Sequence, residues 1–258
     1  MIFQKSSTRT RVSFETGMYQ LGGNPLYLSA SDMQIGRGEP IQDTARVLSR
    51  YIDGIMIRTF EQAEVENLAE YGNIPIINGL TDLSHPCQVL ADLMTIREYK
   101  GKLDGLKMCY IGDGNNMANS LIVGGLKTGM SVSVACPENY HPAATTLAFA
   151  EKYDCFELTD DPIKAAKDAD VIFTDVWASM GEEDKAAERI ALLRPYQVNK
   201  EMLEMTGKDT TVVMHCLPAV KGHEITEDVF EHYADVIFDE AENRMHTIKA
   251  VMAATLGA

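Results

Sequence analysis

The run Ser7-Thr8-Arg9-Thr10-Arg11 places hydroxyl and guanidinium side chains at the predicted start of a helix. It follows Met1-Ile2-Phe3-Gln4, which has the composition of a strand, and precedes amphipathic residues 12–18. Backbone N–H groups at a helix start attract anions, and arginine adds charge-assisted hydrogen bonds suited to phosphate. Serine and threonine also cap helices without any ligand, so both interpretations stay open at this point. The two interleaved arginines favour an anion site.

Three later positions carry polar chemistry at the ends of apolar runs. Gly112-Asp113-Gly114 resembles half of a dinucleotide-binding fingerprint, but Met117 stands where the third glycine would be, so a tight turn is the simpler interpretation. Asp175 suits either a helix cap or a cationic ligand. Cys216 ends a β-rich run, where a buried and inert thiol is the default interpretation.

The elements that must position these residues alternate regularly along the chain. Continuous apolar runs predict strands at 25–29, 54–58, 74–78, 106–112, 131–136, 171–177, 211–216 and 236–239. Helical patterns lie near 9–21, 41–51, 61–71, 86–99, 116–128, 142–152, 182–193 and 241–256. This alternation predicts an α/β fold with doubly wound parallel sheets, in which ligands bind at the carboxyl ends of the strands.

A polar, glycine-containing break at 100–105 predicts a domain boundary. We expect one domain over residues 1–102 and a second over 103–242, each with a parallel sheet. The apolar helix at 243–258 is expected to return to the first domain.

Composition excludes several classes of protein. The net charge of −15 disfavours nucleic acid and anionic membranes as partners, although the first 60 residues carry seven basic and five acidic side chains. No apolar run reaches the length of a membrane span. The five cysteines and six histidines lack the spacing of a disulfide framework or a metal site. We therefore expect a cytoplasmic protein without a metal.

Four motifs in order resemble the aspartate/ornithine carbamoyltransferase family over nearly the whole chain. They are Ser7-Thr8-Arg9-Thr10-Arg11 followed by Val12-Ser13-Phe14-Glu15, His85-Pro86-Cys87-Gln88, Asp175-Val176-Trp177-Ala178-Ser179-Met180-Gly181, and His215-Cys216-Leu217-Pro218. The last two are similar to the ornithine branch. The resemblance implies a domain for carbamoyl phosphate and a domain for the amino acid, with no cofactor.

The resemblance also assigns roles to residues. It implies that Ser7, Thr8, Arg9, Thr10, Arg58 and Arg244 hold the phosphate end, that His85 contacts the carbamoyl carbonyl oxygen, and that Gln88 holds the carbamoyl amide. Asn116, Asp175, Ser179, Met180, Cys216 and Leu217 would hold ornithine. Gln34 would reach the site of a neighbouring subunit, which implies a homotrimer. Thr10, Arg58, His85, Asp175, Cys216 and Arg244 would be the catalytic residues.

The implied reaction is attack of an amine on the carbamoyl carbonyl, with donors stabilising the developing oxyanion. Putrescine or another amine is the alternative acceptor, and an inactive binding subunit or an NAD-dependent dehydrogenase are alternatives from other classes. Synthesis and breakdown of arginine both remain open. Family members carry a segment before the phosphate signature that this sequence lacks, so we expect the chain to be a fragment or to start late.

Overall fold

The chain forms two compact units, Met1–Cys87 with Arg244–Ala258, and Gln88–Asn243. The structure is a computed structural model and describes residues 1–177 and 186–257. Within those ranges, none of the helices combines the length and the apolar character that crossing a bilayer requires. We call the two parts the first unit and the second unit and describe each by itself.

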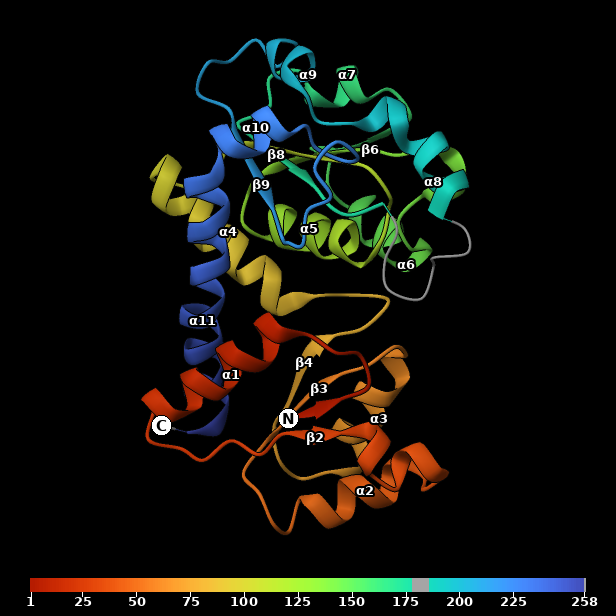
Figure 1. Cartoon of the computed structure of the whole chain (residues 1–258), viewed down its shortest axis with the longest axis vertical. Helices are drawn as coiled ribbons and strands as arrows, with labels where there is room; N and C mark the ends of the chain where they lie inside the picture. The colour runs from red at the N-terminus through yellow and green to blue at the C-terminus, as the bar shows by residue number, and fades with distance from the viewer. Residues whose placement is uncertain (178–185, 258) are drawn as a thin grey trace. The chain divides into compact units, whose positions relative to one another are not determined.

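The first unit contains a four-stranded parallel sheet in the order β2-β1-β3-β4. Its strands are β1 (Ile2–Phe3), β2 (Leu28–Ser29), β3 (Ile55–Arg58) and β4 (Ile76–Leu80), as Figure 1 shows. Its helices are α1 (Thr8–Gln20), α2 (Ile41–Leu48), α3 (Gln62–Tyr71), the short turns η1 (Ala30–Asp32) and η2 (Ile35–Arg37), and the end of α11 (Ala234–Leu256).

Both faces of this sheet are covered, which explains its continuous apolar strands. Ile55 and Ile57 belong to one buried cluster with Leu68 of α3. Met56, which lies between them, belongs to another cluster with Phe14 of α1. Successive side chains of a strand point to opposite faces of the sheet. Because helices cover both faces, Ile55, Met56 and Ile57 are all buried, and the strand is apolar at each of these positions.

The second unit contains a five-stranded parallel sheet in the order β7-β6-β5-β8-β9. The strands are β5 (Lys107–Ile111), β6 (Ser131–Ala135), β7 (Phe156–Thr159), β8 (Val171–Thr174) and β9 (Val212–His215). The helices are α4 (Pro86–Lys100), α5 (Asn116–Lys127), α6 (Ala144–Ala150), α7 (Pro162–Ala166), α8 (Ala186–Leu193), α9 (Lys200–Glu204), α10 (Glu227–His232), the start of α11, and the turns η3 (Glu138–Tyr140) and η5 (Arg194–Tyr196).

The central strand β5 divides its side chains between the two faces. Met108 and Tyr110 pack in one cluster with Leu121 of α5. Cys109 and Ile111 pack in a second cluster with residues of α7, which covers the opposite face (Figure 1). The predicted α/β class with two doubly wound parallel sheets is confirmed by these two arrangements.

The prediction of a strand at 236–239 is wrong. These residues lie in α11, where Val236 is 6% exposed and Phe238 is 56% exposed. In a strand the two side chains would share one face, whereas in a helix they point in different directions. A short apolar run does not distinguish the two structures. Strand β7 and helices α7, α9 and α10 were not predicted, because each is short.

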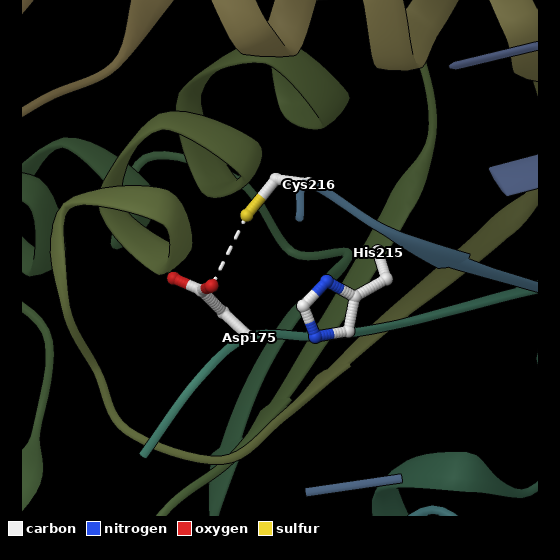
Figure 2. Close-up of side chains that lie close together, drawn as sticks. All are labelled: Asp175, His215 and Cys216. Carbon is white, nitrogen blue, oxygen red and sulfur yellow. Dashed lines mark hydrogen bonds between the residues drawn. The ribbon is translucent and has the colours of Figure 1, made fainter. Parts of the chain in front are cut away.

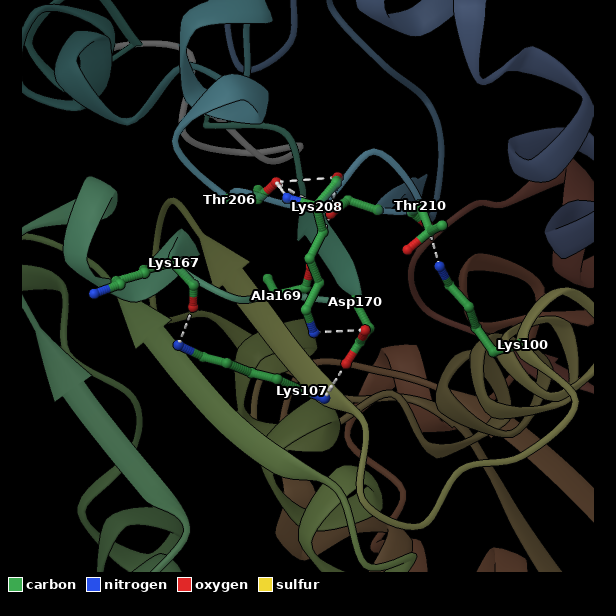
Figure 3. A network of polar contacts seen from close by, with 9 residues as sticks. Lys100, Lys107, Lys167, Ala169, Asp170, Thr206, Lys208 and Thr210 are labelled. Carbon is green, nitrogen blue, oxygen red and sulfur yellow. Dashed lines mark hydrogen bonds and ion pairs between the residues drawn. The ribbon is translucent and has the colours of Figure 1, made fainter.

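A polar network connects the amino ends of three strands in the second unit (Figure 3). Asp170, just before β8, accepts a hydrogen bond from the Lys107 backbone N–H at 2.8 Å and pairs with Lys208 at 2.7 Å. Thr211, just before β9, donates to the Ala169 carbonyl at 2.8 Å. The network therefore ties β5, β8 and β9 together at the edge opposite to their carboxyl ends.

Candidate functional site

Each sheet has one point where the strand order reverses direction. In the first unit it lies between β1 and β3, and in the second unit between β5 and β8. Open α/β sheets bind ligands in the crevice outside the carboxyl ends of the strands at such a point. The motif that begins at Ser7 follows β1, and Asp175 follows β8, so both lie at such points, whereas His85 follows the neighbouring strand β4 and His215 ends the neighbouring strand β9.

At the first reversal point, the start of α1 holds the Thr10 hydroxyl in place. Ser7 caps the helix by accepting from the Thr10 backbone N–H at 3.2 Å, and its hydroxyl donates to Thr10 Oγ1 at 3.1 Å. Arg244 Nη2 also donates to Thr10 Oγ1, at 3.3 Å. Since that oxygen accepts twice, the hydroxyl can offer its own hydrogen to a ligand.

The charges of two buried arginines act on His85. Burial lowers the pKa of His85 well below its usual range, and the charges of Arg244 and Arg58 lower it further. Arg58 is 9% exposed and Arg244 is 5% exposed. His85 is therefore neutral at physiological pH and carries one ring N–H.

Thr8 and Arg9, expected to hold the phosphate, and Gln34, expected to reach a neighbouring subunit, lie at the surface. Thr8 and Arg9 occupy the exposed first turn of α1, and Gln34 is exposed at the start of η2. Arg11 pairs with Glu15 at 3.1 Å and lies 3.7 Å from the centre of the Tyr27 ring, so its role within the described residues is structural.

At the second reversal point, the Asp175 carboxylate is the centre of a hydrogen-bond group (Figure 2). Its Oδ1 accepts from the Cys216 thiol at 3.1 Å and from the Val176 backbone N–H at 2.8 Å. Its Oδ2 accepts from Asn115 Nδ2 at 2.9 Å. Residues from the ends of β5, β8 and β9 thus converge on one carboxylate.

Cys216 is a thiol and not a thiolate in this environment. Burial raises the pKa of Cys216 well above its ordinary value, and the neighbouring Asp175 charge raises it further. Only the thiolate is a good nucleophile. Cys216 is therefore not in the ionisation state that covalent catalysis requires.

Asp175, His215 and Cys216 have potential ligand atoms within 4.8 Å of one another (Figure 2). Both ring nitrogens of His215 are already engaged, however. Nδ1 accepts from the Leu217 backbone N–H at 2.9 Å, which leaves Nε2 to donate to Glu224 at 3.2 Å. The histidine supports the backbone around Leu217, whose φ of +58° lies in the left-handed region, and is not arranged as a metal ligand.

The glycine-containing turn after β5 serves close packing. A Cβ atom added at Gly114 would lie 2.3 Å from the Tyr140 carbonyl oxygen. Met117, at the position of the missing third glycine, is buried in the core. The interpretation of a tight turn is the better one. Asn116 is the first residue of α5 and is half-buried.

Gln88 lies in the first turns of α4 and is 1% exposed. Its Nε2 donates to Asp92 at 2.8 Å and to Glu240 at 2.9 Å. Ser179 and Met180, the remaining predicted ligands of ornithine, lie outside the described residues.

Sequence reasoning missed Asn115 and Arg189. The Asn115 side chain caps α5 through Met117 N at 2.8 Å and also reaches Asp175. Arg189 is 8% exposed, donates to the Trp177 carbonyl at 2.7 Å, pairs with Asp113, and lies 4.7 Å from the Tyr140 ring centre. The N-cap position after a glycine turn could have indicated Asn115, whereas nothing local distinguishes Arg189.

Comparison with protein families gives one match to the N-terminal part of the chain and a second match to the remainder. Residues 1–98 match the carbamoyl-P binding domain of aspartate/ornithine carbamoyltransferase, and residues 104–255 match the Asp/Orn binding domain. The chain belongs to the aspartate/ornithine carbamoyltransferase family. The resemblance found in the four motifs is thereby confirmed.

Individual carbamoyltransferases are similar over the whole chain. The ornithine carbamoyltransferase of Thermococcus kodakarensis is 56% identical over 262 residues, covering 100% of this chain and 83% of the relative. The solved ornithine carbamoyltransferase of Pyrococcus furiosus is 55% identical, with a TM-score of 0.95, covering 100% of this chain and 84% of that one. The ornithine transcarbamoylase of Giardia lamblia is 32% identical with a TM-score of 0.88, covering 99% and 84%.

Proposed function

We propose that this protein transfers the carbamoyl group of carbamoyl phosphate to the side-chain amine of L-ornithine, giving L-citrulline and phosphate. The observation that carries the proposal is the concentration of positive charge around His85, whose pKa is lowered first by burial and further by the charges of Arg244 and Arg58. Such a group suits a ligand with a phosphate and an adjacent carbonyl oxygen.

In the first unit, Ser7, Thr8, Arg9, Thr10, Arg58 and Arg244 would bind the phosphate end of the donor. Neutral His85 and the Thr10 hydroxyl would donate to the carbonyl oxygen. As the amine nitrogen bonds to the carbonyl carbon, negative charge grows on that oxygen and these donors stabilise it. The bond from carbon to the phosphate oxygen then breaks, the proton of the amine nitrogen passes to the departing phosphate, and the arginines hold the charge of that phosphate.

In the second unit, Asp175 would pair with an ammonium group of the acceptor, and Cys216 and Leu217 would fix the attacking amine. Gln88 would accept from the carbamoyl amide, and Asn116 would hold the acceptor carboxylate. Ser179 and Met180 complete the proposed set. Holding both reactants in one geometry lowers the barrier without a cofactor.

Ornithine is preferred over putrescine because a diamine has no carboxylate for Asn116 to bind. The relatives from Thermococcus kodakarensis and Pyrococcus furiosus are named ornithine carbamoyltransferases, the second of them anabolic. We therefore infer a role in arginine biosynthesis for this chain. An NAD-dependent dehydrogenase is not supported by a turn whose third glycine is replaced by Met117.

The test is citrulline formation by the purified chain, with carbamoyl phosphate and either ornithine or putrescine. We expect product from ornithine alone. Product from putrescine at equal or greater kcat/KM would overturn the acceptor assignment. Absence of product from both, with carbamoyl phosphate still bound, would identify an inactive binding subunit.

Three further features belong to the same proposal. The domains would run over 1–102 with 243–258, and over 103–242. The protein would act in the cytoplasm.

Gln34 would extend into the site of a second copy in a homotrimer. Sedimentation and the loss of activity on Gln34→Ala in mixed oligomers would test the shared site.

A further inference from the structure

Three polar side chains of the second unit converge beside Gly112, the residue after β5. A Cβ atom added at Gly112 would lie 3.7 Å from Thr174 Oγ1 and 3.8 Å from both Trp177 Nε1 and the Tyr110 hydroxyl oxygen. Among the described residues these are the nearest atoms, apart from those of the glycine and its chain neighbours. At Gly125 of α5 the nearest atoms are side-chain carbons at 2.5 and 2.7 Å. The space beside Gly112 is therefore polar and less crowded.

Two of these side chains are buried without a hydrogen bond in the part of the chain that the structure describes. Thr174 is 2% exposed and Trp177 is 1% exposed, and neither Thr174 Oγ1 nor Trp177 Nε1 has a partner there. Nearly all buried polar groups in folded proteins hydrogen-bond to protein or to ordered water, because an unpaired group has a large desolvation cost. Since both groups face the same point, one small ligand can satisfy both.

The three groups restrict the chemistry of that ligand. The Trp177 indole N–H can only donate, so the ligand must accept a hydrogen bond. The Tyr110 hydroxyl donates its one hydrogen to the Asp113 carbonyl at 2.7 Å, so only its lone pairs can face the ligand, which must donate to them. The Thr174 hydroxyl can do either. A metal or ammonium ion cannot accept and a simple anion cannot donate, whereas water does both.

The same side chains belong to the two segments that form the Asp175 group. Thr174 directly precedes Asp175, and Trp177 follows it by two residues. The Tyr110 hydroxyl also lies 3.3 Å from Asn115 Oδ1, and Asn115 in turn donates to Asp175 at 2.9 Å. A ligand that bridges Tyr110 to Thr174 and Trp177 therefore connects the turn after β5 to the segment after β8.

We propose that the second unit binds one water molecule beside Gly112, between Trp177, Thr174 and Tyr110, and that this water positions Asp175 for the acceptor. The water accepts from the Trp177 N–H, donates to the Tyr110 oxygen, and uses its remaining hydrogen or lone pair for the Thr174 hydroxyl. A buried water with about three such partners is part of the structure and is costly to remove. The water site is independent of the proposed function, whereas its effect on the acceptor rests on that function.

The first test is a crystal structure of the unaltered chain at a resolution that shows ordered solvent. We expect one solvent peak at about 2.7–3.2 Å from Trp177 Nε1, Thr174 Oγ1 and the Tyr110 oxygen. A protein atom at that position, or density without such a peak, would overturn the proposal. This test needs no variant, so it decides even if a substitution prevents folding.

Thr174→Val gives a second test, in which the sign of the effect decides. Valine keeps the shape of threonine but lacks the hydroxyl. Without a bound water, the substitution removes an unpaired buried polar group and should lower the equilibrium constant of unfolding. With the water bound, a hydrogen bond is lost, and the constant should rise about 5-fold, the scale of one such bond. Urea unfolding measures the constant.

Thr211→Val is the matched control, because Thr211 is 4% exposed and its hydroxyl donates to the Ala169 carbonyl at 2.8 Å. This variant loses a hydrogen bond between two protein groups and should raise the unfolding constant. A change in the opposite direction for Thr174→Val would show that Thr174 has no ligand and would overturn the water site.

The positioning role is tested through the two substrates. Thr174→Val should raise KM for ornithine about 3-fold and change the Kd of carbamoyl phosphate less than about 2-fold, because small displacements near reacting groups are costly. Thr174→Ser retains the hydroxyl and should keep the parent KM. An unchanged KM for ornithine in Thr174→Val, or equal weakening of both substrates, would overturn the positioning role. If the unaltered chain forms no citrulline, the proposed function fails, while the solvent peak and the unfolding constant still decide the water site.

Discussion

The reversal points of the two sheets share a backbone plan and differ in charge. Both lie between parallel strands, and at each point a short loop leads from one strand to a helix start, from β1 to α1 and from β5 to α5. The first is dominated by Arg58 and Arg244 around a neutral His85, and the second by Asp175 beside an un-ionised Cys216. The same fold thus provides one region suited to an anion and another suited to an ammonium group. Side chains at the strand ends, and not the sheet, decide which.

The largest expected effect is on the cationic region. Arg58→Ala should cost about 3 kcal/mol of transition-state stabilisation, the scale of one oxyanion donor, and should lower kcat/KM for both substrates. Steady-state kinetics measures it. Arg50→Ala, an exposed arginine of the same unit, is the control and should behave as the parent chain. Near-normal turnover by Arg58→Ala would remove Arg58 from the mechanism.

The second effect tests the anionic region. Asp175→Asn keeps the shape but removes the charge, so it should cost about 2 kcal/mol in kcat/KM for ornithine, as expected of a charged hydrogen bond. Carbamoyl-phosphate binding should hardly change. Asp160→Asn, at an exposed site after β7, serves as the control. If the use of ornithine and the binding of carbamoyl phosphate are weakened equally, the segment around Asp175 supports the fold and does not select the acceptor.

Arg189 contacts the two segments that position Asp175 and Asn115, but it contacts neither of these residues in the bonds described above. It holds the Trp177 carbonyl and Asp113, which lie two residues from Asp175 and Asn115 respectively. Arg189→Met should raise KM for ornithine about 10-fold, or roughly 1.4 kcal/mol, because small displacements near reacting groups are costly. Arg194→Met changes a nearby exposed arginine and should leave KM for ornithine unchanged. A changed KM for carbamoyl phosphate alone would contradict this assignment.

The alternation of strands and helices was predictable because each buried strand is a continuous apolar run, as in Ile55–Arg58. The placement of Ser7, Arg58 and Asp175 at strand ends followed from the same pattern. Contacts between distant residues were not predictable in this way. Arg189 and Asp113 are 76 residues apart, and the capping asparagine that reaches Asp175 is Asn115, one residue before the one singled out.

Composition gave wrong or missing predictions of secondary structure where an element is short or combines apolar and polar residues. Val236 to Asp239 had a β-rich composition, yet the long helix α11 takes in those residues. Strand β7 was missed because Phe156–Thr159 is half-buried throughout and contains a glutamate. A short apolar run indicates that a segment is buried, but tertiary packing decides whether that segment is a helix or a strand.

The smallest expected effect concerns the opposite edge of the second sheet, where Asp170 serves the fold alone (Figure 3). Burial by itself would raise the pKa of Asp170, but Lys208 and the Lys107 N–H outweigh it, so the pKa lies below its ordinary 3.8. The stabilisation is therefore complete above pH 3.8 and is lost as the pH falls through the lower folded value.

Asp170→Asn should lower the free energy of unfolding by about 1 kcal/mol or less at pH 7, with kinetics unchanged. Urea unfolding at pH 7 and in acid measures it, and the difference between variant and parent should shrink in acid. Glu157→Gln removes a more exposed ion pair with Lys164 and should change stability less. An altered KM in Asp170→Asn would mean that the amino edge of the sheet influences the region around Asp175 through β8, against the separation of fold and site that the two reversal points indicate.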